Sequence, residues 1–317
     1  MKKILFIIDK IELKYFEFNK LVTNFWLIKE FLDRGNAVYI TTISQLALHN
    51  KTAYANCYEA FCENDNIFYK DFNIKKEIDS FDLVMFRPDP PVDIDYINAT
   101  YIFDFVTKPD VINSPAAIRS FNEKLHSLYF KDYMTDCIVS SSMSDIEEFL
   151  SAKKQIVLKP LNRCFGAGVM YLYEGDPNTH TIINTITNNG TTLAMVQEFI
   201  PNVKKGDIRV LTLGDRILPY SIKKLPGNDD FKFNTHNDSY IIKSDLSNSD
   251  LEYFIPVAKK LNSIGISMAG LDVIDNKIIE INVTSPCYFI KEINERFNTK
   301  LEQELGDFLL TPSLLSL

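Results

Sequence analysis

The stretch GLDVI (270–274), followed after a short turn by IEINVTSP (279–286), has the pattern of two strands joined in a hairpin. Residues two apart in a strand lie on the same face of a sheet, so Glu280 and Asn282 share a face and the turn brings Asp272 opposite them. Carboxylate and amide oxygens together suit a hard cation such as Mg²⁺. A solvent-facing polar strand face is the simpler interpretation of this pattern alone. The flanking residues are apolar, however, and unpaired carboxylates in buried strands are costly, which favours a metal site.

A lysine and a glycine-containing loop lie upstream of this hairpin. Lys159 closes a short apolar run and is followed by a loop with Gly166 and Gly168. Backbone amides of such a loop can approach phosphates while the lysine adds a positive charge. The sequence therefore indicates a phosphate site, although the loop is not a Walker sequence.

A third candidate binding site lies at the end of a later predicted strand. Gln197-Glu198-Phe199-Ile200 leaves that strand just before a proline, where backbone groups can hydrogen-bond to a purine. Asp207 and Arg209 share a face of the following strand, which places an acid within reach of a ribose. An ordinary edge strand with a salt bridge is the alternative interpretation.

The composition is that of an ordinary folded protein. Of 317 residues, 46% are hydrophobic and 24% charged, which supplies a core. At about 150 residues per domain this length predicts two domains or two lobes. The 42 acidic residues outnumber the 34 basic ones, which gives a net charge of −8, and the sequence has no long basic run. We therefore expect no nucleic-acid partner and no binding to membrane surfaces. The sequence contains no run of 18 apolar residues, so no transmembrane helix is predicted.

Targeting and redox signals point to a cytoplasmic chain. The run MKKILFIID (1–9) turns polar after five apolar residues and lacks a cleavage site, so it is not predicted to be a secretory signal. The five cysteines are odd in number and mostly far apart, and the four histidines are too scattered to complete a zinc site with them. We therefore expect a reduced, cytoplasmic protein.

The hydrophobic pattern predicts an α/β lobe followed by an α+β region. A strand at 3–8, a helix at 18–34 that stops at Gly35 and a strand at 37–42 form a βαβ unit with a parallel sheet. A polar segment at 226–248 is predicted to be a long loop. The remaining elements are strands at 83–86, 111–113, 156–159, 169–173, 192–199, 208–213, 216–221, 267–274 and 277–282, and helices at 116–130 and 251–265.

Seven strings in this order resemble the ATP-grasp superfamily and, within it, the bacterial glutathione synthetase family. They are MFRPDPPVDIDYINATYI (85–102), NSPAAIRSFNEKL (113–125), IVLKPL (156–161), YEGDPN (173–178), GDIRVL (206–211), GLDVI (270–274) and IEINVTSP (279–286). The resemblance implies an ATP-grasp fold with an N-terminal parallel βαβ (pre-ATP-grasp) lobe. It implies a lobe at 1–120 and an ATP-grasp domain at 121–317, divided into a central nucleotide lobe (121–198) and a C-terminal catalytic lobe (199–317).

The same resemblance implies an activity and a set of site residues. The activity is ATP-dependent ligation through an acyl phosphate, in which γ-glutamylcysteine is joined to glycine by a dimeric or tetrameric enzyme. Two Mg²⁺ ions, with Mn²⁺ as a tolerated substitute, are implied at Asp272, Glu280 and Asn282. The implied ATP-binding residues are Lys124, Lys159, Gly166, Gln197, Glu198, Phe199, Ile200 and Asp207; the catalytic ones are Arg209, Lys224 and Asn282; the substrate-binding ones are Arg87, Lys232, Thr284 and Ser285.

Departures from the family pattern bear on the substrate. Arg163 and Phe165 replace small residues in the phosphate loop, and Lys224 and Lys232 replace arginines, which keeps the charge but not the two-pronged geometry. Segment 227–239 has one glycine where the family has several, and we expect it to act as a ligand-ordered lid. Two alternatives stay open: a related peptide ligase with another acyl donor or amine, and a degenerate paralogue that binds ATP without ligating.

One arginine, one histidine and two cysteines are interpreted separately. Arg87 precedes a proline-rich turn, where a carboxylate contact and a structural anchor are equally compatible with the pattern. His236 is interpreted as a solvated loop residue, and Cys164 and Cys287 as packing thiols, because ATP-grasp chemistry uses no covalent enzyme nucleophile.

Overall fold

The N-terminal lobe is built on the expected parallel unit. The computed structural model describes residues 1–9, 20–164, 166–225 and 240–311. Strand β1 (Lys3–Ile8), helix α2 (Thr23–Asp33) and strand β2 (Ala37–Thr42) form the βαβ unit, and β7 (Leu83–Phe86) and β8 (Asp110–Ile112) extend the parallel sheet on the other side of β1. Gly35 ends the helix with φ +76°, a conformation that glycine adopts without strain.

An antiparallel extension of this sheet was not predicted from the sequence. Strand β2 pairs with β4 (Thr52–Glu63), which in turn pairs with the three short strands β3 (Leu46–His49), β5 (Asn66–Tyr69) and β6 (Ile74–Glu77). The strands of this lobe are linked by helix α3 (Ile94–Ile102) and by short 3₁₀ helices at Ile43–Gln45, Ile78–Ser80 and Phe103–Phe105.

The single helix predicted at 116–130 is wrong. The structure has helix α4 (Pro115–Ser120) and a 3₁₀ helix (Leu125–Tyr133) with a break between them. The carboxamide Oδ1 of Asn122 accepts hydrogen bonds from the amides of Lys124 (3.1 Å) and Leu125 (2.9 Å), and an asparagine that caps backbone amides in this way competes with a continuous helix.

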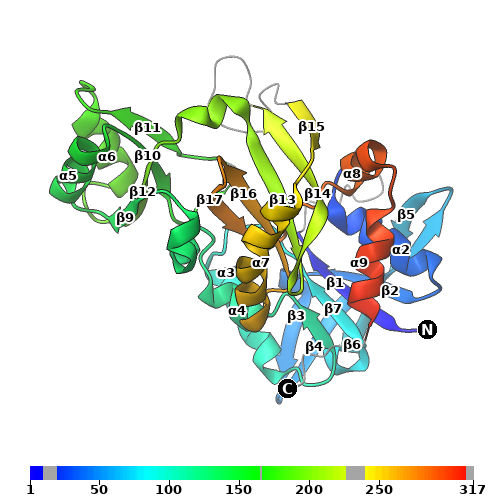
Figure 1. Ribbon diagram of the computed structural model, residues 1–317. Coiled ribbons are helices and arrows are strands. Elements are labelled where there is room, and N and C mark those ends of the chain that lie inside the picture. The colour runs from blue at the N-terminus through cyan, green and yellow to red at the C-terminus, as the bar shows by residue number, and fades with distance from the viewer. Residues whose placement is uncertain (10–19, 165, 226–239, 312–317) are drawn as a thin grey trace.

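The central lobe is a small antiparallel sheet covered by two helices (Figure 1). The strand order is β11-β10-β12-β9, and α5 and α6 bury a separate apolar core against it. The elements are β9 (Cys137–Ser140), α5 (Met143–Lys153), β10 (Gln155–Pro160), β11 (Met170–Tyr173), α6 (Thr179–Thr187) and β12 (Ala194–Glu198).

The C-terminal lobe contains a five-stranded antiparallel sheet in the order β15-β14-β13-β16-β17. Its elements are β13 (Asp207–Leu213), β14 (Arg216–Leu225), β15 (Tyr240–Ser244), α7 (Asn248–Ser263), β16 (Met268–Ile274) and β17 (Lys277–Asn282), with a 3₁₀ helix at Pro201–Lys205. The predicted loop at 226–248 is therefore wrong at 240–244, which pairs with β14. The lid expected at 227–239 lies outside the described residues.

The C-terminal sheet and the N-terminal lobe share one hydrophobic core. Helices α8 (Ile290–Phe297) and α9 (Leu301–Leu310) return the chain to the N-terminal lobe, where α9 packs beside α2 (Figure 1). Ile4 and Phe6 of β1 belong to the same buried cluster as Leu211 of β13 and Leu305 of α9. Among the described residues, no helix has the length and apolar character needed to cross a membrane.

Candidate active site

One cavity of about 690 Å³ lies where the three lobes meet. It runs from the end of β12, across the C-terminal sheet, to the start of α8. Lys232, like His236, lies outside the described residues. The predicted site residues that line the cavity are Arg87, Lys124, Lys159, Gly166, Gln197, Glu198, Phe199, Ile200, Asp207, Arg209, Lys224, Asp272, Glu280, Asn282, Thr284 and Ser285.

Strand register places a buried ion-pair cluster in the middle of this cavity. Asp272 lies opposite Arg209 across β13 and β16, and its two oxygens accept hydrogen bonds from Nε (2.7 Å) and Nη2 (3.3 Å) of the guanidinium. The Nδ2 of Asn282 donates to the same carboxylate at 3.1 Å. Gly270 makes room for the arginine, since a Cβ there would lie 2.8 Å from Arg209 Nη1.

Lys224 extends this cluster to a second carboxylate. Its Nζ lies 2.7 Å from Asp207 Oδ2 and 3.3 Å from Asp272 Oδ1. Burial alone would raise the pKa of Asp272, but the charges of Arg209 and Lys224 outweigh burial and hold that pKa well below its usual range. Burial, with the adjacent charge of Asp272, instead raises the pKa of Asp207 to about 6. Two cations thus neutralise the carboxylates of the cluster.

The residues predicted as metal ligands have the oxygen chemistry that a magnesium site needs. Glu280 lies opposite Asp272 across β16 and β17, and its carboxylate is 2.9 Å from Lys124 Nζ. Within the described part of the chain no three Asp, Glu, His or Cys side chains form a ready metal cluster. Two carboxylates and the Asn282 amide suit Mg²⁺, which commonly binds through few protein ligands and takes the rest from substrate phosphates and water.

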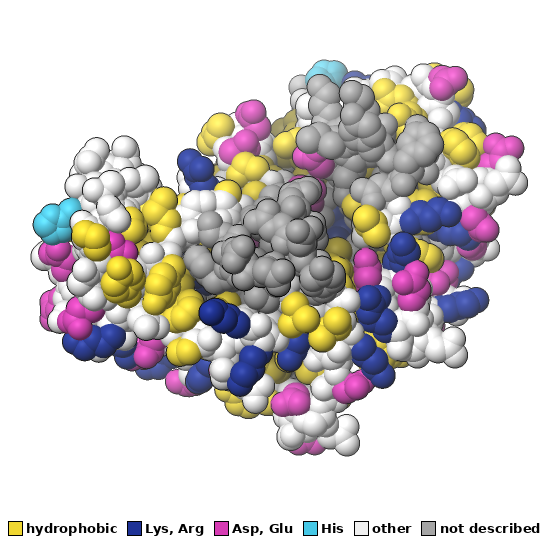
Figure 2. All heavy atoms as spheres, turned by 90° about the horizontal axis from the view of Figure 1, so that it is seen from above, with side chains coloured by type: hydrophobic (Ala, Val, Ile, Leu, Met, Phe, Trp, Pro, Cys, Tyr) yellow, Lys and Arg dark blue, Asp and Glu magenta, His cyan; other side chains and the backbone are white. Residues whose placement is uncertain are grey.

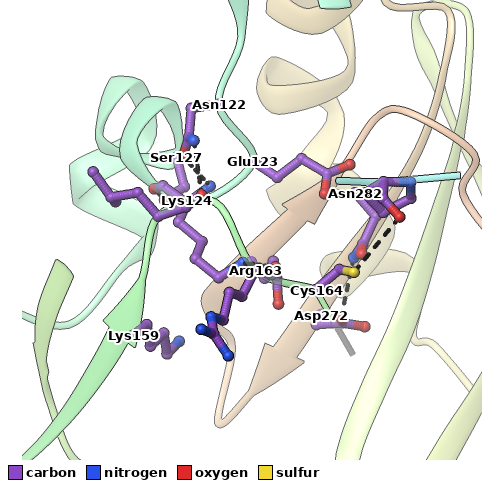
Figure 3. Close-up of polar contacts among 12 residues, drawn as sticks. Asn122, Glu123, Lys124, Ser127, Lys159, Arg163, Cys164, Asp272 and Asn282 are labelled. Carbon is purple, nitrogen blue, oxygen red and sulfur yellow. Dashed lines mark hydrogen bonds and ion pairs between the residues drawn. The ribbon is translucent and has the colours of Figure 1, made fainter. Parts of the chain in front are cut away.

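Glu123, which the sequence analysis passed over, fixes the backbone that follows β17. Its Oε1 accepts hydrogen bonds from the amides of Val283 (2.6 Å) and Thr284 (3.0 Å) and from the hydroxyl of Thr284 (3.1 Å). Figure 3 shows Glu123 and Lys124 pointing in different directions from adjacent positions. Burial, together with the charge of Glu280, raises the pKa of Glu123. Its position next to Lys124 in the NEKL string was the sequence feature that could have indicated a role in the site.

Lys124 also contacts the glycine-containing loop after β10. Its Nζ donates to the carbonyl of Arg163 at 2.6 Å (Figure 3). The side-chain amide of Asn122 donates to the carbonyl of Leu161 at 2.8 Å. Gly166 and Gly168 both have positive φ, as the turns of this loop require. The loop lies near the N-terminal lobe, since Cys164 Sγ is 3.7 Å from the carbonyl of Pro90.

Lys159 is a buried lysine that lines the same cavity. Its Nζ donates to Gln197 Oε1 (2.8 Å) and to the carbonyl of Ile279 (3.0 Å). Burial lowers the pKa of Lys159 to about 8, so the ammonium form predominates at neutral pH at a cost in desolvation. An anionic ligand beside this ammonium would relieve that cost.

Replacing Lys159 with methionine should weaken nucleotide binding by about 10- to 100-fold, the range of a charge-assisted hydrogen bond. The free protein should change in stability by less than about 1 kcal/mol, because two lost hydrogen bonds are offset by removal of a buried charge. ATP titration by calorimetry and urea unfolding without ligand measure the two quantities. A loss of several kcal/mol in the free protein would make Lys159 a structural residue and end its phosphate assignment.

The segment after β12 is held in place and presents an apolar slot. The amide of Glu198 donates to the carbonyl of Asp136 (2.9 Å) and that of Phe199 to the carbonyl of Gln155 (3.0 Å). Phe199 packs against Tyr171 with ring centroids 4.7 Å apart. Val157, Val169, Ile200, Val203 and Ile274 line the same part of the cavity, a surface that suits a planar base.

The opposite wall comes from the N-terminal lobe and the segment after β17. Arg87 is buried, with Nε donating to Asn24 Oδ1 (2.6 Å) and Nη2 to the carbonyl of Pro286 (2.9 Å), so it anchors this segment as well as lining the cavity. Arg209 Nη1 donates to the next carbonyl, that of Cys287, at 3.1 Å. Asp89, another residue that sequence analysis missed, contacts Ser285, and burial raises the pKa of this aspartate.

Comparison with known proteins agrees with this architecture. Residues 2–119 match the prokaryotic glutathione synthetase N-terminal domain, and residues 123–298 match the prokaryotic glutathione synthetase ATP-grasp domain. The solved structure of a Chryseobacterium gregarium RiPP-associated ATP-grasp ligase, in complex with ADP and a leader and core peptide, is similar with a TM-score of 0.64 at 14% identity. The match covers 98% of this chain and 96% of that one. This likeness shows the ATP-grasp fold.

Two curated relatives extend the similarity over nearly the whole chain. The glutathione synthetase of Shewanella oneidensis is 31% identical over 293 residues, which cover 91% of this chain and 93% of the relative. That of Neisseria meningitidis serogroup B is 32% identical over 297 residues, which cover 91% and 92%. The fold, the cavity and these matches together show that the chain is an ATP-grasp ligase and belongs to the prokaryotic glutathione synthetase family.

Proposed function

We propose that this protein is an ATP-dependent carboxylate–amine ligase that joins γ-glutamylcysteine to glycine. The observation that carries the proposal is the cavity itself: an apolar slot at one end is continuous with an ion-pair cluster in the middle. The cluster offers cations for phosphates and carboxylates for a metal within one space.

The reaction has two displacements. The carboxylate oxygen of the acyl donor attacks the γ-phosphorus of ATP, ADP leaves, and an acyl phosphate forms. The amine nitrogen then attacks the acyl carbon, phosphate leaves with the electron pair of the broken C–O bond, and the amine loses a proton to form the amide.

The chain's own cations are assigned to the phosphates. Lys124 and Lys159 would hold the nucleotide phosphates, while Arg209 and Lys224 would stabilise the oxygens that gain charge during transfer. Adenosine would be bound by Gln197, the segment 198–200 and Asp207. The amino-acid substrates would be contacted by Arg87, Lys232, Thr284 and Ser285. The carbonyls of Pro286 and Cys287, bound by the two arginines, keep these guanidinium groups beside the cavity.

Asp272, Glu280 and Asn282 would hold two Mg²⁺ ions, with Mn²⁺ as a tolerated substitute. The bound ions would neutralise charge on the phosphate oxygens. In the free protein Lys124 neutralises Glu280 and Arg209 neutralises Asp272. When metal and nucleotide are bound, Glu280 and Asp272 would face the metal and the two cations would be free to face the phosphates, so nucleotide and metal should bind together.

The wider organisation is part of the same proposal. We assign residues 1–120 to the N-terminal lobe, 121–198 to the nucleotide lobe and 199–317 to the catalytic lobe of a cytoplasmic dimer or tetramer. The separate core of the central lobe supports a division there. On the face shown in Figure 2, lysine and arginine side chains alternate with acidic ones instead of forming one basic patch, which supports small-molecule substrates over nucleic acid.

Phosphate release with each component omitted in turn tests the proposal. We expect release from ATP and Mg²⁺ to require γ-glutamylcysteine and to reach its full rate only with glycine. Full release with a different acid or amine would favour the related peptide ligase, and no release with any pair would favour the paralogue that only binds ATP.

A further inference from the structure

Among the described residues, three buried side-chain atoms lack a hydrogen-bond partner: Gln197 Nε2, Asp207 Oδ1 and Glu292 Oε2. All three residues line the active-site cavity. Buried polar atoms in folded proteins are nearly always partnered, so an unpartnered one that faces a binding cavity calls for a ligand group. The nucleotide assignment accounts for Gln197 and Asp207. It does not account for Glu292, which no motif singled out.

Glu292 lies at the end of the cavity remote from the purine slot. It is in the first turn of α8, where buried Ile290 and Ile293 fix the helix on the core. Figure 1 shows α8 and β12 on opposite sides of the C-terminal sheet. The cavity wall near α8 also contains Ile241 and Phe289. A ligand group that meets Glu292 therefore belongs to an amino-acid substrate and not to the adenine base.

The charges around Glu292 are arranged for a zwitterion. Glu292, Arg209 and Cys287 line the same cavity. Burial raises the pKa of the Cys287 thiol, and the negative charge of Glu292 adds to this increase while the positive charge of Arg209 opposes it. Arg209 donates to the carbonyl of Cys287 and Arg87 to that of Pro286. Two guanidinium groups and one carboxylate thus border the same short segment.

A carboxylate oxygen that lacks a hydrogen-bond donor favours a ligand group that donates a hydrogen bond and carries a positive charge. Phosphates and the acyl carboxylate are anionic acceptors and would be repelled. Of the groups that the proposed reaction brings to this end, an ammonium group is the cationic donor, and apolar walls strengthen such a pair. We propose that Glu292 is a specificity-determining residue that binds the ammonium group of an amino-acid substrate. This inference rests on the proposed function.

Steady-state kinetics of Glu292→Gln tests the assignment. We expect the KM for one amino-acid substrate to rise by about 10- to 100-fold, the range for a hydrogen bond to a charged group, while the KM for ATP stays within about twofold. Glutarylcysteine, which lacks only the α-ammonium group of γ-glutamylcysteine, separates the two sources. If the acyl donor supplies the ammonium, the wild type discriminates between these acids and the variant does not. If the incoming amine supplies it, the glycine KM alone rises.

The controls separate this inference from a folding defect and from the proposed function. Glu295→Gln changes an exposed carboxylate on the same helix and should leave every constant unchanged. Equal thermal midpoints and ATP affinities would show that Glu292→Gln is folded. An unchanged KM for both amino-acid substrates, or an ATP KM that rises equally with theirs, would overturn the role of Glu292.

Failure of the wild type to ligate would count against the proposed function alone. Calorimetric binding of γ-glutamylcysteine and of glycine to the wild type and to Glu292→Gln would then decide the inference. Weaker binding of either compound to the variant supports it, and unchanged binding of both overturns it.

Discussion

Glu280→Gln should lower the rate of ligation by about two to three orders of magnitude while the protein stays folded. Loss of a metal ligand removes several kcal/mol of stabilisation from the charge that develops in the transition state, and each 1.4 kcal/mol or so is tenfold in rate. The cost in stability should be below about 1 kcal/mol, because Glu280 is one-quarter exposed and its ion pair with Lys124 is partly solvated. Steady-state turnover and urea unfolding measure the two effects.

Glu252→Gln, an exposed change on α7, is the matched control and should leave turnover unaltered. Higher Mg²⁺ should restore part of the activity of Glu280→Gln, because the weakened site then fills by mass action. Turnover equal to that of the wild type at low Mg²⁺ would remove Glu280 from the metal site.

Asp272→Ala should destabilise the free protein by about 3–5 kcal/mol, the largest stability effect that we expect from one side chain in the cavity. Removing this carboxylate leaves Arg209 without its ion-pair partner and Lys224 with Asp207 alone, all of them buried. A buried charge that loses its partner costs far more than the intact pair contributes. Urea unfolding of the free protein measures the loss.

The pH dependence gives an independent check on Asp272. Because the folded-state pKa of this carboxylate lies below its unfolded value, its contribution to stability is present above the unfolded pKa, about 4, and is lost as the pH falls below it. This part of the acid sensitivity should be missing in Asp272→Ala. Asp245→Ala, which removes an exposed ion pair with Lys243, should change stability by less than about 1 kcal/mol. An Asp272→Ala protein as stable as this control would contradict the ion-pair cluster.

Local pattern was sufficient to predict the sheets that carry the site. A buried strand is marked by a short apolar run, and a hairpin by two such runs around a turn. The strands at 267–274 and 277–282 were therefore predicted within one residue of β16 and β17. The alternation of side chains along a strand also placed Asp207 with Arg209 and Glu280 with Asn282, and the structure brings all four to one cavity.

Weak local signals account for the elements that were missed. The strands β3, β5 and β6 are short and mixed in polarity, and β15 lies in a polar stretch, so their strand structure depends on pairing with neighbours instead of on a buried run. The break between α4 and the 3₁₀ helix accompanies the capping of local amides by Asn122, and the side chains of residues 122–124 also bond to distant segments. Periodicity within a window does not register such contacts.

The sequence by itself determined the fold family, the order of the main strands and the residue types at the site, since these depend on spacing along the chain. Only the tertiary structure decided which charges pair. Arg209 meets Asp272 from 63 residues away, and Glu123 meets Thr284 from 161 residues away. Glu292 gained its meaning in the same way: a glutamate in the first turn of a helix is unremarkable in sequence, and only packing of α8 against the cavity leaves one of its oxygens buried without a partner. Partner choice among buried polar groups is a property of the packed chain, because desolvation acts only once distant segments close around the group.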